Sequence, residues 1–290
     1  MKPECLPKKD EARIVKTIGK RLIEMIILIL FGVLNLVPIF WGIVTSLKEQ
    51  KEIASYPPKI FGFQISLEHY ARIFTSGYIR SIANSFIYSV CAILLGVLVG
   101  YLAAYGFERL QFRFKKVFFY IVVAGIPLSV GSSILLVPNY LYMMQLGLTN
   151  KWYTLVLLYA AYNLPMAIWL LIAGIKAIPI EIEEAATVDG CSKLYIVSRI
   201  IPPLLKPSIA AASLFIFIGA WNEYITASVM VNSARLKTIQ MAIYDYLGYF
   251  GQEWGPLTAA ATIAVLPILL VFTFLGKMLV SGLTAGAVKG

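Results

Sequence analysis

The chain has 290 residues, of which 59% are hydrophobic and only 14% are charged, and its mean hydropathy is +0.79. An ordinary soluble domain carries roughly 25% charged residues, so this composition excludes the common soluble classes. The net charge of +10 does not indicate a nucleic-acid-binding protein, because the basic residues lie in short, scattered connections and form no single patch with interleaved aromatic residues.

Six long runs of the sequence contain no Asp, Glu, Lys or Arg. A helix rises about 1.5 Å per residue, so about 20 apolar residues cross the roughly 30 Å hydrocarbon core of a membrane. The run 117–150 is too long for one crossing and contains Pro127 and Pro138, whereas the run 207–222 is short and is expected to continue through Glu223. We therefore predict an all-α integral membrane protein with six spans, which cover residues 25–47, 83–105, 115–137, 153–175, 207–231 and 257–279.

The distribution of Lys and Arg predicts the orientation of these spans. Six spans place both termini on one side of the membrane, and the segments on that side contain 17 basic residues, against 8 in the connections on the other side. Cytoplasmic connections carry the excess of basic residues, so both termini are expected in the cytoplasm. The first apolar run, residues 25–47, is too long for a secretory signal and follows a segment, 1–24, that is expected to remain cytoplasmic.

Few side chains are suited to catalysis or ion coupling. The single histidine, His69, is expected to be solvated on the exterior, within a short surface helix at 65–74 for which Ser66 is available as a cap. Charges inside the predicted spans are nearly lacking, and no G-x-x-x-x-G-K-[ST] phosphate loop is present. If the protein moves a solute uphill, a partner must supply the energy. Glu223 lies either within the membrane, which would hint at function, or in the interfacial zone beside Trp221 and Tyr224.

Residues 178–206, between the fourth and fifth predicted spans, are acidic and rich in small residues. Pro179 suits the first turn of a helix, and Glu183 and Glu184 would follow near its N-terminal end, where negative charge complements the helix dipole. Gly190 can end this helix, because glycine adopts the left-handed conformation at low steric cost.

A second helix is predicted directly after that turn. Ser192 can cap it, and it would run to about Ile201, where the pair Pro202-Pro203 is expected to break it. The pattern predicts a helix, a sharp turn and a helix on the cytoplasmic face. Taken alone, this pattern is equally consistent with a simple connection between two spans.

The segment EEAATVDGCSKLYIVSRIIPPLLKP, residues 183–207, resembles the motif E-A-A-x-x-x-G followed at fixed spacing by I-x-L-P, which marks the membrane subunits of ATP-binding-cassette (ABC) importers. Pro202 stands where the motif has leucine. The resemblance extends through AAYGFERLQF at 103–112, WNEY at 221–224 and the C-terminal VSGLTAGAVKG, and it is to the carbohydrate importer permeases, in particular the second permease of the maltose-transporter type. The type I permease fold is the architecture that this resemblance implies.

The resemblance also implies which residues meet the ATPase. Segment 178–206 would sit in a cleft of a cytoplasmic ATPase subunit and transmit its closure to the spans, while the tail 281–290 would be small and flexible and would reach between the ATPase subunits. The implied coupling residues are Glu183, Glu184, Ala185, Ala186, Asp189, Gly190, Ser192, Ile200 and Pro203. The implied contacts of the tail are Gly282, Leu283, Thr284, Gly286 and Lys289.

The implied partners are a second permease chain, expected to differ from this one, two ATPase subunits that bind ATP and Mg, an exterior sugar-binding protein, and membrane lipid, but no nucleic acid. No catalytic residue, metal site or cofactor is expected in this chain. The sugar, an oligosaccharide or related compound, would pass between the two permeases. Its candidate contacts are the polar and aromatic residues inside the spans, namely Tyr162, Asn163, Trp221 and Asn222.

Three alternatives remain at this point. An importer permease for a non-sugar solute would carry the same coupling motif. A self-contained carrier or channel would move solute without an ATPase. A membrane enzyme or scaffold is also open, although the predicted spans contain no plausible catalytic constellation.

Overall fold

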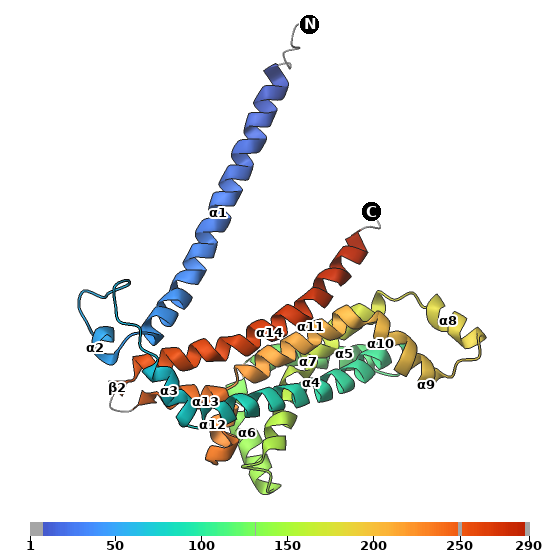
Figure 1. Ribbon diagram of the computed structural model, residues 1–290. Helices are drawn as coiled ribbons and strands as arrows, with labels where there is room; N and C mark the ends of the chain where they lie inside the picture. The colour runs from blue at the N-terminus through green and yellow to red at the C-terminus, as the bar shows by residue number, and fades with distance from the viewer. Residues whose placement is uncertain (1–7, 131, 249–250, 288–290) are drawn as a thin grey trace.

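The computed structural model describes residues 8–130, 132–248 and 251–287, which are almost entirely helical (Figure 1). Within these residues the only strands are the short antiparallel pair β1 (Leu247–Gly248) and β2 (Gly251–Gln252). The long helices are α1 (Lys8–Ser46), α4 (Tyr78–Arg109), α5 (Lys115–Val130), α6 (Ser132–Gln145), α7 (Trp152–Lys176), α11 (Lys206–Trp221) and α14 (Trp254–Ala287). The short helices are α2 (Gln50–Ile53), α3 (Glu68–Thr75), α8 (Glu181–Val188), α9 (Lys193–Tyr195), η1 (Ile196–Ile200), α10 (Ile201–Leu204), α12 (Ile225–Met230), η2 (Ala234–Leu236) and α13 (Ile239–Tyr244).

Four helices in the described residues are long and apolar enough to cross a membrane: Lys20–Ser46, Tyr78–Arg109, Trp152–Lys176 and Trp254–Met278. A fifth is added if the pair Lys193–Leu204 and Lys206–Trp221, which is bent by 78°, counts as one span. These helices coincide with the first, second, fourth, fifth and sixth predicted spans.

Two of the predicted spans are shorter in the structure than expected. The third, predicted for 115–137, is divided between α5 and α6, and Pro127 removes one backbone hydrogen bond from the end of α5. The fifth, predicted to reach residue 231, ends at Trp221. It ends there because Glu223 accepts hydrogen bonds from the backbone N–H groups of Thr226 (2.7 Å) and Ala227 (3.1 Å) and so begins the separate helix α12.

The centre of the bundle is formed by α4, α7 and α11, which pack against one another. Two glycines of α4 face these neighbours. A β-carbon on Gly96 would lie 2.8 Å from Cδ1 of Ile216 in α11, and one on Gly100 would lie 3.3 Å from Cδ1 of Leu171 in α7. The small residues therefore permit the close approach of helices that their spacing suggests.

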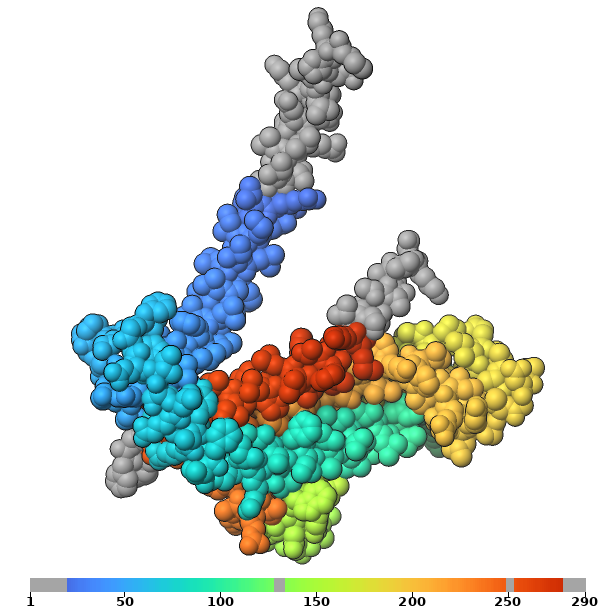
Figure 2. Space-filling model, in the orientation of Figure 1, coloured from blue at the N-terminus to red at the C-terminus, as the bar shows by residue number. Residues whose placement is uncertain are grey.

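The first helix, α1, projects away from this bundle, as Figure 2 shows for the part of the helix that is drawn in colour. Its long apolar side chains, such as Leu28 and Phe31, are exposed along the helix, and its contacts with the rest of the chain are mainly with α14. Such a surface is compatible with hydrocarbon and incompatible with water.

The junction beneath α1 corrects one expectation from the sequence. His69, expected to be solvated, is only 5% exposed, and its Nε2 lies 2.9 Å from the backbone oxygen of Lys48. The Lys48 side chain is itself buried and has its Nζ 5.3 Å from the ring centre of Trp41. The histidine is buried because α3 packs against α14, where Gly255 leaves room for the imidazole.

Replacement of Gly255 by alanine is expected to destabilise the protein by about 1–3 kcal/mol, the usual cost of overpacking a core. A β-carbon there would lie 2.2 Å from Nε2 of His69, and the ring is held by Lys48. Thermal unfolding of the detergent-solubilised protein measures the effect. Gly276→Ala is the matched control on the same helix, because its β-carbon would meet nothing closer than 3.8 Å. Equal unfolding temperatures for the two variants would contradict the prediction.

Candidate functional site

The helices α8 and α9 form an elbow at one end of the bundle, and α2, α3 and the β1–β2 pair lie at the opposite end (Figure 1). The elbow is the segment that the sequence predicts as a helix, a turn and a helix. Its two ends are continuous with α7 and with α10–α11, so any displacement of the elbow acts directly on helices of the central bundle.

The turn of the elbow has the predicted chemistry. Helix α8 ends at Val188 with Asp189 as its C-cap, and Gly190 follows with φ +84°, in the left-handed region. The N–H of Gly190 donates to the carbonyl of Thr187 (3.0 Å), and that of Cys191 donates to the carbonyl of Ala186 (2.9 Å). This pair of bonds is the Schellman arrangement, which satisfies the last carbonyls of the helix and fixes the direction of the chain that leaves it.

The second arm of the elbow begins as predicted but ends differently. The Ser192 hydroxyl caps α9 by accepting a hydrogen bond from the N–H of Tyr195 (3.3 Å). The helix then passes through a π-helical turn, η1, and continues through Pro202-Pro203 to Leu204, so the prediction that these prolines break it was wrong. Prolines are tolerated in the first turn of α10 because the N–H groups of a first turn have no helical partner.

A hydrogen bond from α4 supports the π-helical turn. The N–H of Ile201 donates to the carbonyl of Ile196, five residues back, and Pro202 has no N–H to donate. The carbonyl of Val197 accepts instead from the hydroxyl of Tyr101 at 2.5 Å. The second arm is therefore attached to the central bundle as well as to α11.

The elbow has an inner and an outer face, which the structure assigns residue by residue. Glu183 and Ala186 are buried, and Ala186 belongs to the hydrophobic core, so Ala186 offers little surface to a partner. Ile200 is half-buried. The remaining predicted coupling residues are exposed, namely Glu184, Ala185, Asp189, Gly190, Ser192 and Pro203.

Sequence reasoning missed the most exposed apolar side chains of the elbow. Val188 is 87% exposed and Leu194 is 78% exposed, one on each side of the turn, and Tyr195 is exposed beside them. Large apolar side chains at such exposure on the tip of a folded elbow indicate an interaction surface. The signal in the sequence was an apolar residue directly before Asp189-Gly190 and another directly after the capping serine.

On the inner face, Glu183 makes an ion pair with Arg109, the last residue of α4. Nε of Arg109 lies 2.6 Å from Oε1 of Glu183, and the hydroxyl of Tyr105 donates to Oε2 at 2.8 Å. The same guanidinium donates through Nη2 to the carbonyls of Ile175 (3.2 Å) and Ile178 (2.8 Å). Neither Arg109 nor Tyr105 was predicted as a site residue, although both lie in the quoted segment AAYGFERLQF.

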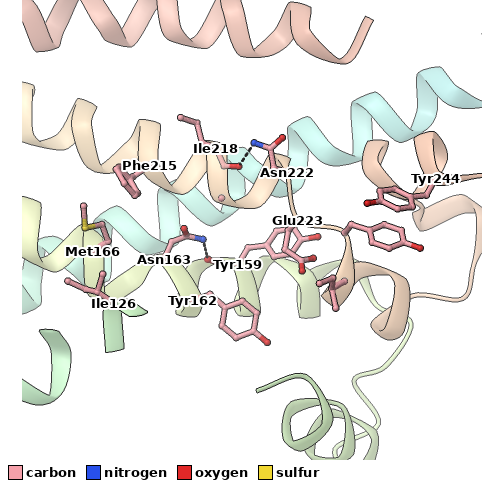
Figure 3. Close-up of a pocket in the computed structure, with 13 residues that line it drawn as sticks. Ile126, Tyr159, Tyr162, Asn163, Met166, Phe215, Ile218, Asn222, Glu223 and Tyr244 are labelled. Carbon is pink, nitrogen blue, oxygen red and sulfur yellow. Dashed lines mark hydrogen bonds between the residues drawn. The ribbon is translucent and has the colours of Figure 1, made fainter. Parts of the chain in front are cut away.

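A second feature is a cavity of about 610 Å³ between the central helices and the segment after Trp221 (Figure 3). Three of the four residues expected in a substrate path line it, namely Tyr162, Asn163 and Asn222. Trp221 does not: it is 1% exposed and stacks on Phe217 with ring centres 5.3 Å apart. The other lining residues are Ile126, Tyr159, Met166, Phe215, Ile218, Gly219, Glu223, Tyr224, Ile225 and Tyr244.

The cavity combines amide groups with tyrosine rings. The side-chain amides of Asn163 and Asn222 donate to the backbone carbonyls one turn earlier, at 2.8 and 3.0 Å, which fixes their orientation (Figure 3). Tyr224 and Tyr244 stack with ring centres 3.8 Å apart. The Glu223 carboxylate, which caps α12, also lines the cavity. Oriented amides, a carboxylate and aromatic rings suit a ligand rich in hydroxyl groups.

Long apolar helices around a cavity that contains amide, carboxylate and tyrosine groups, with an exposed elbow at one end, define a membrane transport component. Residues 92–285 match the family described as binding-protein-dependent transport system inner membrane component. The chain belongs to this family. It is a permease of the ABC-importer type and a multi-pass component of the cell membrane.

Curated relatives match over nearly the whole chain. The chain is 32% identical to the trehalose/maltose transport system permease protein MalG of Thermococcus litoralis, over 93% of this chain and 98% of the relative. It is 31% identical to the diacetylchitobiose uptake system permease protein DasC of Streptomyces coelicolor, over 87% of this chain and 91% of the relative. Both relatives are named as sugar-transport permeases.

Solved structures share the fold. A chain of a bacterial ABC transporter involved in the import of the acidic polysaccharide alginate superposes with a TM-score of 0.75 and 20% identity, and the match covers 94% of this chain and 99% of that one. A chain of the MetNI methionine ABC transporter, in an inward-facing conformation, gives a TM-score of 0.53 and 17% identity, over 74% of this chain and 98% of that one.

Proposed function

We propose that this chain is one of two permease subunits of an ATP-driven importer for a carbohydrate, an oligosaccharide or related sugar. The observation that carries the proposal is the elbow: its inner face is fixed to the bundle, and its outer face presents Glu184 between exposed apolar residues. A segment that is rigidly attached to the bundle through one face and binds a partner through the other can transmit the partner's movement to the helices.

The partner at the elbow is a cytoplasmic ATPase, of which two copies bind ATP and Mg. Glu184 is the polar contact, and Ala185, Val188 and Leu194 are the packing contacts. The chain crosses the membrane six times, with α5 and α6 together as the third crossing, and both termini lie in the cytoplasm. A 16-residue helix such as α5 spans only about 24 Å, so α5 needs the start of α6 to complete a crossing.

The C-terminal contacts with the ATPase extend from a helix. Helix α14 continues to Ala287, so Gly282, Leu283, Thr284 and Gly286 lie within a helix, whereas the tail was expected to be flexible. Lys289 lies outside the described residues.

The solute is a sugar that passes through the cavity lined by Tyr224, Tyr244 and Asn163, and the second permease completes the path. The tyrosine rings support a sugar over an amino acid, and the relatives named for diacetylchitobiose and trehalose/maltose favour the same choice. The fold alone does not decide between solutes, because the methionine transporter shares it. An exterior sugar-binding protein delivers the solute to the end of the bundle formed by α3, α13 and the β1–β2 pair.

Purification of the tagged chain from native membranes tests this assignment. We expect a second permease and an ATPase to copurify, and we expect Glu184→Cys to cross-link to the ATPase. A set of labelled oligosaccharides, presented to cells with and without the chain, identifies the solute. Cross-linking of Glu184→Cys to an exterior protein would overturn the topology, and uptake by the purified chain alone would favour a self-contained carrier.

A further inference from the structure

The elbow is fastened to a third helix that is not adjacent to it in sequence. The chain joins α8 to α7 on one side and, through α9 and α10, to α11 on the other. The ion pair between Glu183 and Arg109 adds α4, whose last residue is 74 positions away from Glu183. Movement of α8 can therefore reach the central bundle by a route that the chain connectivity does not provide.

Both oxygens of the Glu183 carboxylate are engaged, one by Arg109 and one by Tyr105. The side chains of the ion pair are only 11% and 10% exposed. The pair Lys20–Glu24 on α1 offers a contrast, with a separation of 3.8 Å and side chains that are 80% and 58% exposed. Exposed ion pairs of that kind contribute little to stability, whereas a buried pair with its hydrogen-bonding groups satisfied fixes a single geometry.

Arg109 also holds the end of α7. Its Nη2 donates to the carbonyl of Ile175 in the last turn of α7 and to that of Ile178 just beyond the helix. A cation at the carboxyl ends of α4 and α7 and a carboxylate in the first turn of α8 are both favoured by the helix dipoles. One guanidinium thus joins α4, α7 and α8, and the dipoles of all three helices favour the charges placed there.

We propose that Arg109, Tyr105 and Glu183 form a rigid joint that makes α4 move with the elbow. They are positioning residues, and the inference rests on the proposed function of the elbow. The coupling thereby reaches α4, the central helix whose Gly96 and Gly100 lie against α11 and α7. A push on α8 displaces α4, α7 and α11 as one body.

The test measures the movement directly. Spin labels are placed at exposed positions of α8 and α4 by Glu181→Cys and Leu102→Cys, in a complex in which the native cysteines of this chain are replaced by serine. We expect the distance between the two spin labels to have one narrow distribution, which is the same with and without a non-hydrolysable ATP analogue. Glu183→Gln is expected to broaden that distribution and to make it depend on nucleotide.

The same variants are assayed for sugar imported per ATP hydrolysed. Glu183→Gln and Arg109→Gln are each expected to lower this ratio about tenfold, a typical size for a coupling interaction. The reversed pair, Arg109→Glu with Glu183→Arg, is expected to recover part of the loss, which a general structural defect would not do. Tyr105→Phe keeps the ion pair and folds without a buried unpaired charge, and its expected loss is about twofold.

Glu24→Gln, in the exposed pair on α1, is the matched control and should change neither measurement. A narrow, nucleotide-independent distance in Glu183→Gln would overturn the joint and leave the proposed function standing. Failure of the unmodified complex to import any sugar would overturn the proposed function, and the distance measurement would still decide on the joint. If Glu183→Gln fails to assemble, Tyr105→Phe and the reversed pair provide the same two measurements.

Discussion

Gly190→Val is expected to reduce ATP-driven uptake at least about tenfold while the chain still inserts into the membrane. Gly190 has φ +84° and donates the hydrogen bond that closes α8. The left-handed conformation costs ordinary residues roughly 1–2 kcal/mol and a β-branched residue more, so valine forces the turn to open. The two arms of the elbow then lose their fixed angle. Uptake of labelled sugar, normalised to the amount of membrane-inserted chain, measures the effect.

Two controls separate this cause from others. Gly190→Asn should keep most of the uptake, because asparagine tolerates the left-handed conformation. Gly62→Val imposes the same strain at φ +75° near the opposite end of the bundle, where a β-carbon also meets open space, and it should leave ATP coupling unchanged. Normal uptake by Gly190→Val would show that the angle of the elbow does not matter.

Combined Val188→Glu and Leu194→Glu substitutions are expected to remove the ATPase from the copurified complex. These two side chains are the most exposed large apolar groups of the elbow. Burial of a carboxylate against an apolar cleft leaves an unpaired charge, and loss of a central contact of this kind typically costs about 2 kcal/mol or more. Quantification of the ATPase retained on the tagged chain measures the effect.

The control for this pair is Phe61→Glu, which places the same charge at an apolar side chain that is 81% exposed in the connection between α2 and α3. It should leave the amount of ATPase unchanged. Full retention of the ATPase by the double variant would show that Val188 and Leu194 do not form the docking surface, whatever the role of Glu184.

Local chemistry explains why the elbow could be predicted. Gly190 and Ser192 act through hydrogen bonds that span three to five residues, and residues this close in sequence determine such bonds on their own. The close approach at Gly96 and Gly100 depends on equally local information, because their spacing places both glycines on one face of a helix.

The roles of neighbouring acids could not be predicted in this way. Glu183 and Glu184 are adjacent in the first turn of a short helix, and nothing local distinguishes the inner one from the outer one. The distinction comes from Arg109, which approaches only because α4 crosses the end of α7. His69 was wrongly predicted to be solvated for a related reason, since its burial depends on Gly255, nearly two hundred residues later in the sequence.

The cavity shows a similar limit. Tyr162, Asn163 and Asn222 were identified as polar or aromatic residues inside predicted spans. Tyr244 lies in the long connection between α11 and α14, and it reaches the cavity only because that connection folds back so that Tyr244 stacks on Tyr224. Trp221 was assigned to the cavity by its residue type, but the rotation of α11 turns it into the core.

The pairing of α1 with α14 has a consequence for how the protein is made. Helix α1 leaves the ribosome well before α14, yet its main contacts within the described chain are with α14. While the intervening residues are synthesised, the apolar stretch of α1, residues 25–46, therefore resides in lipid without that neighbour, and its exposed apolar side chains make it stable there. Its final docking can occur only after translation of α14 has finished, so truncated chains cannot complete the bundle.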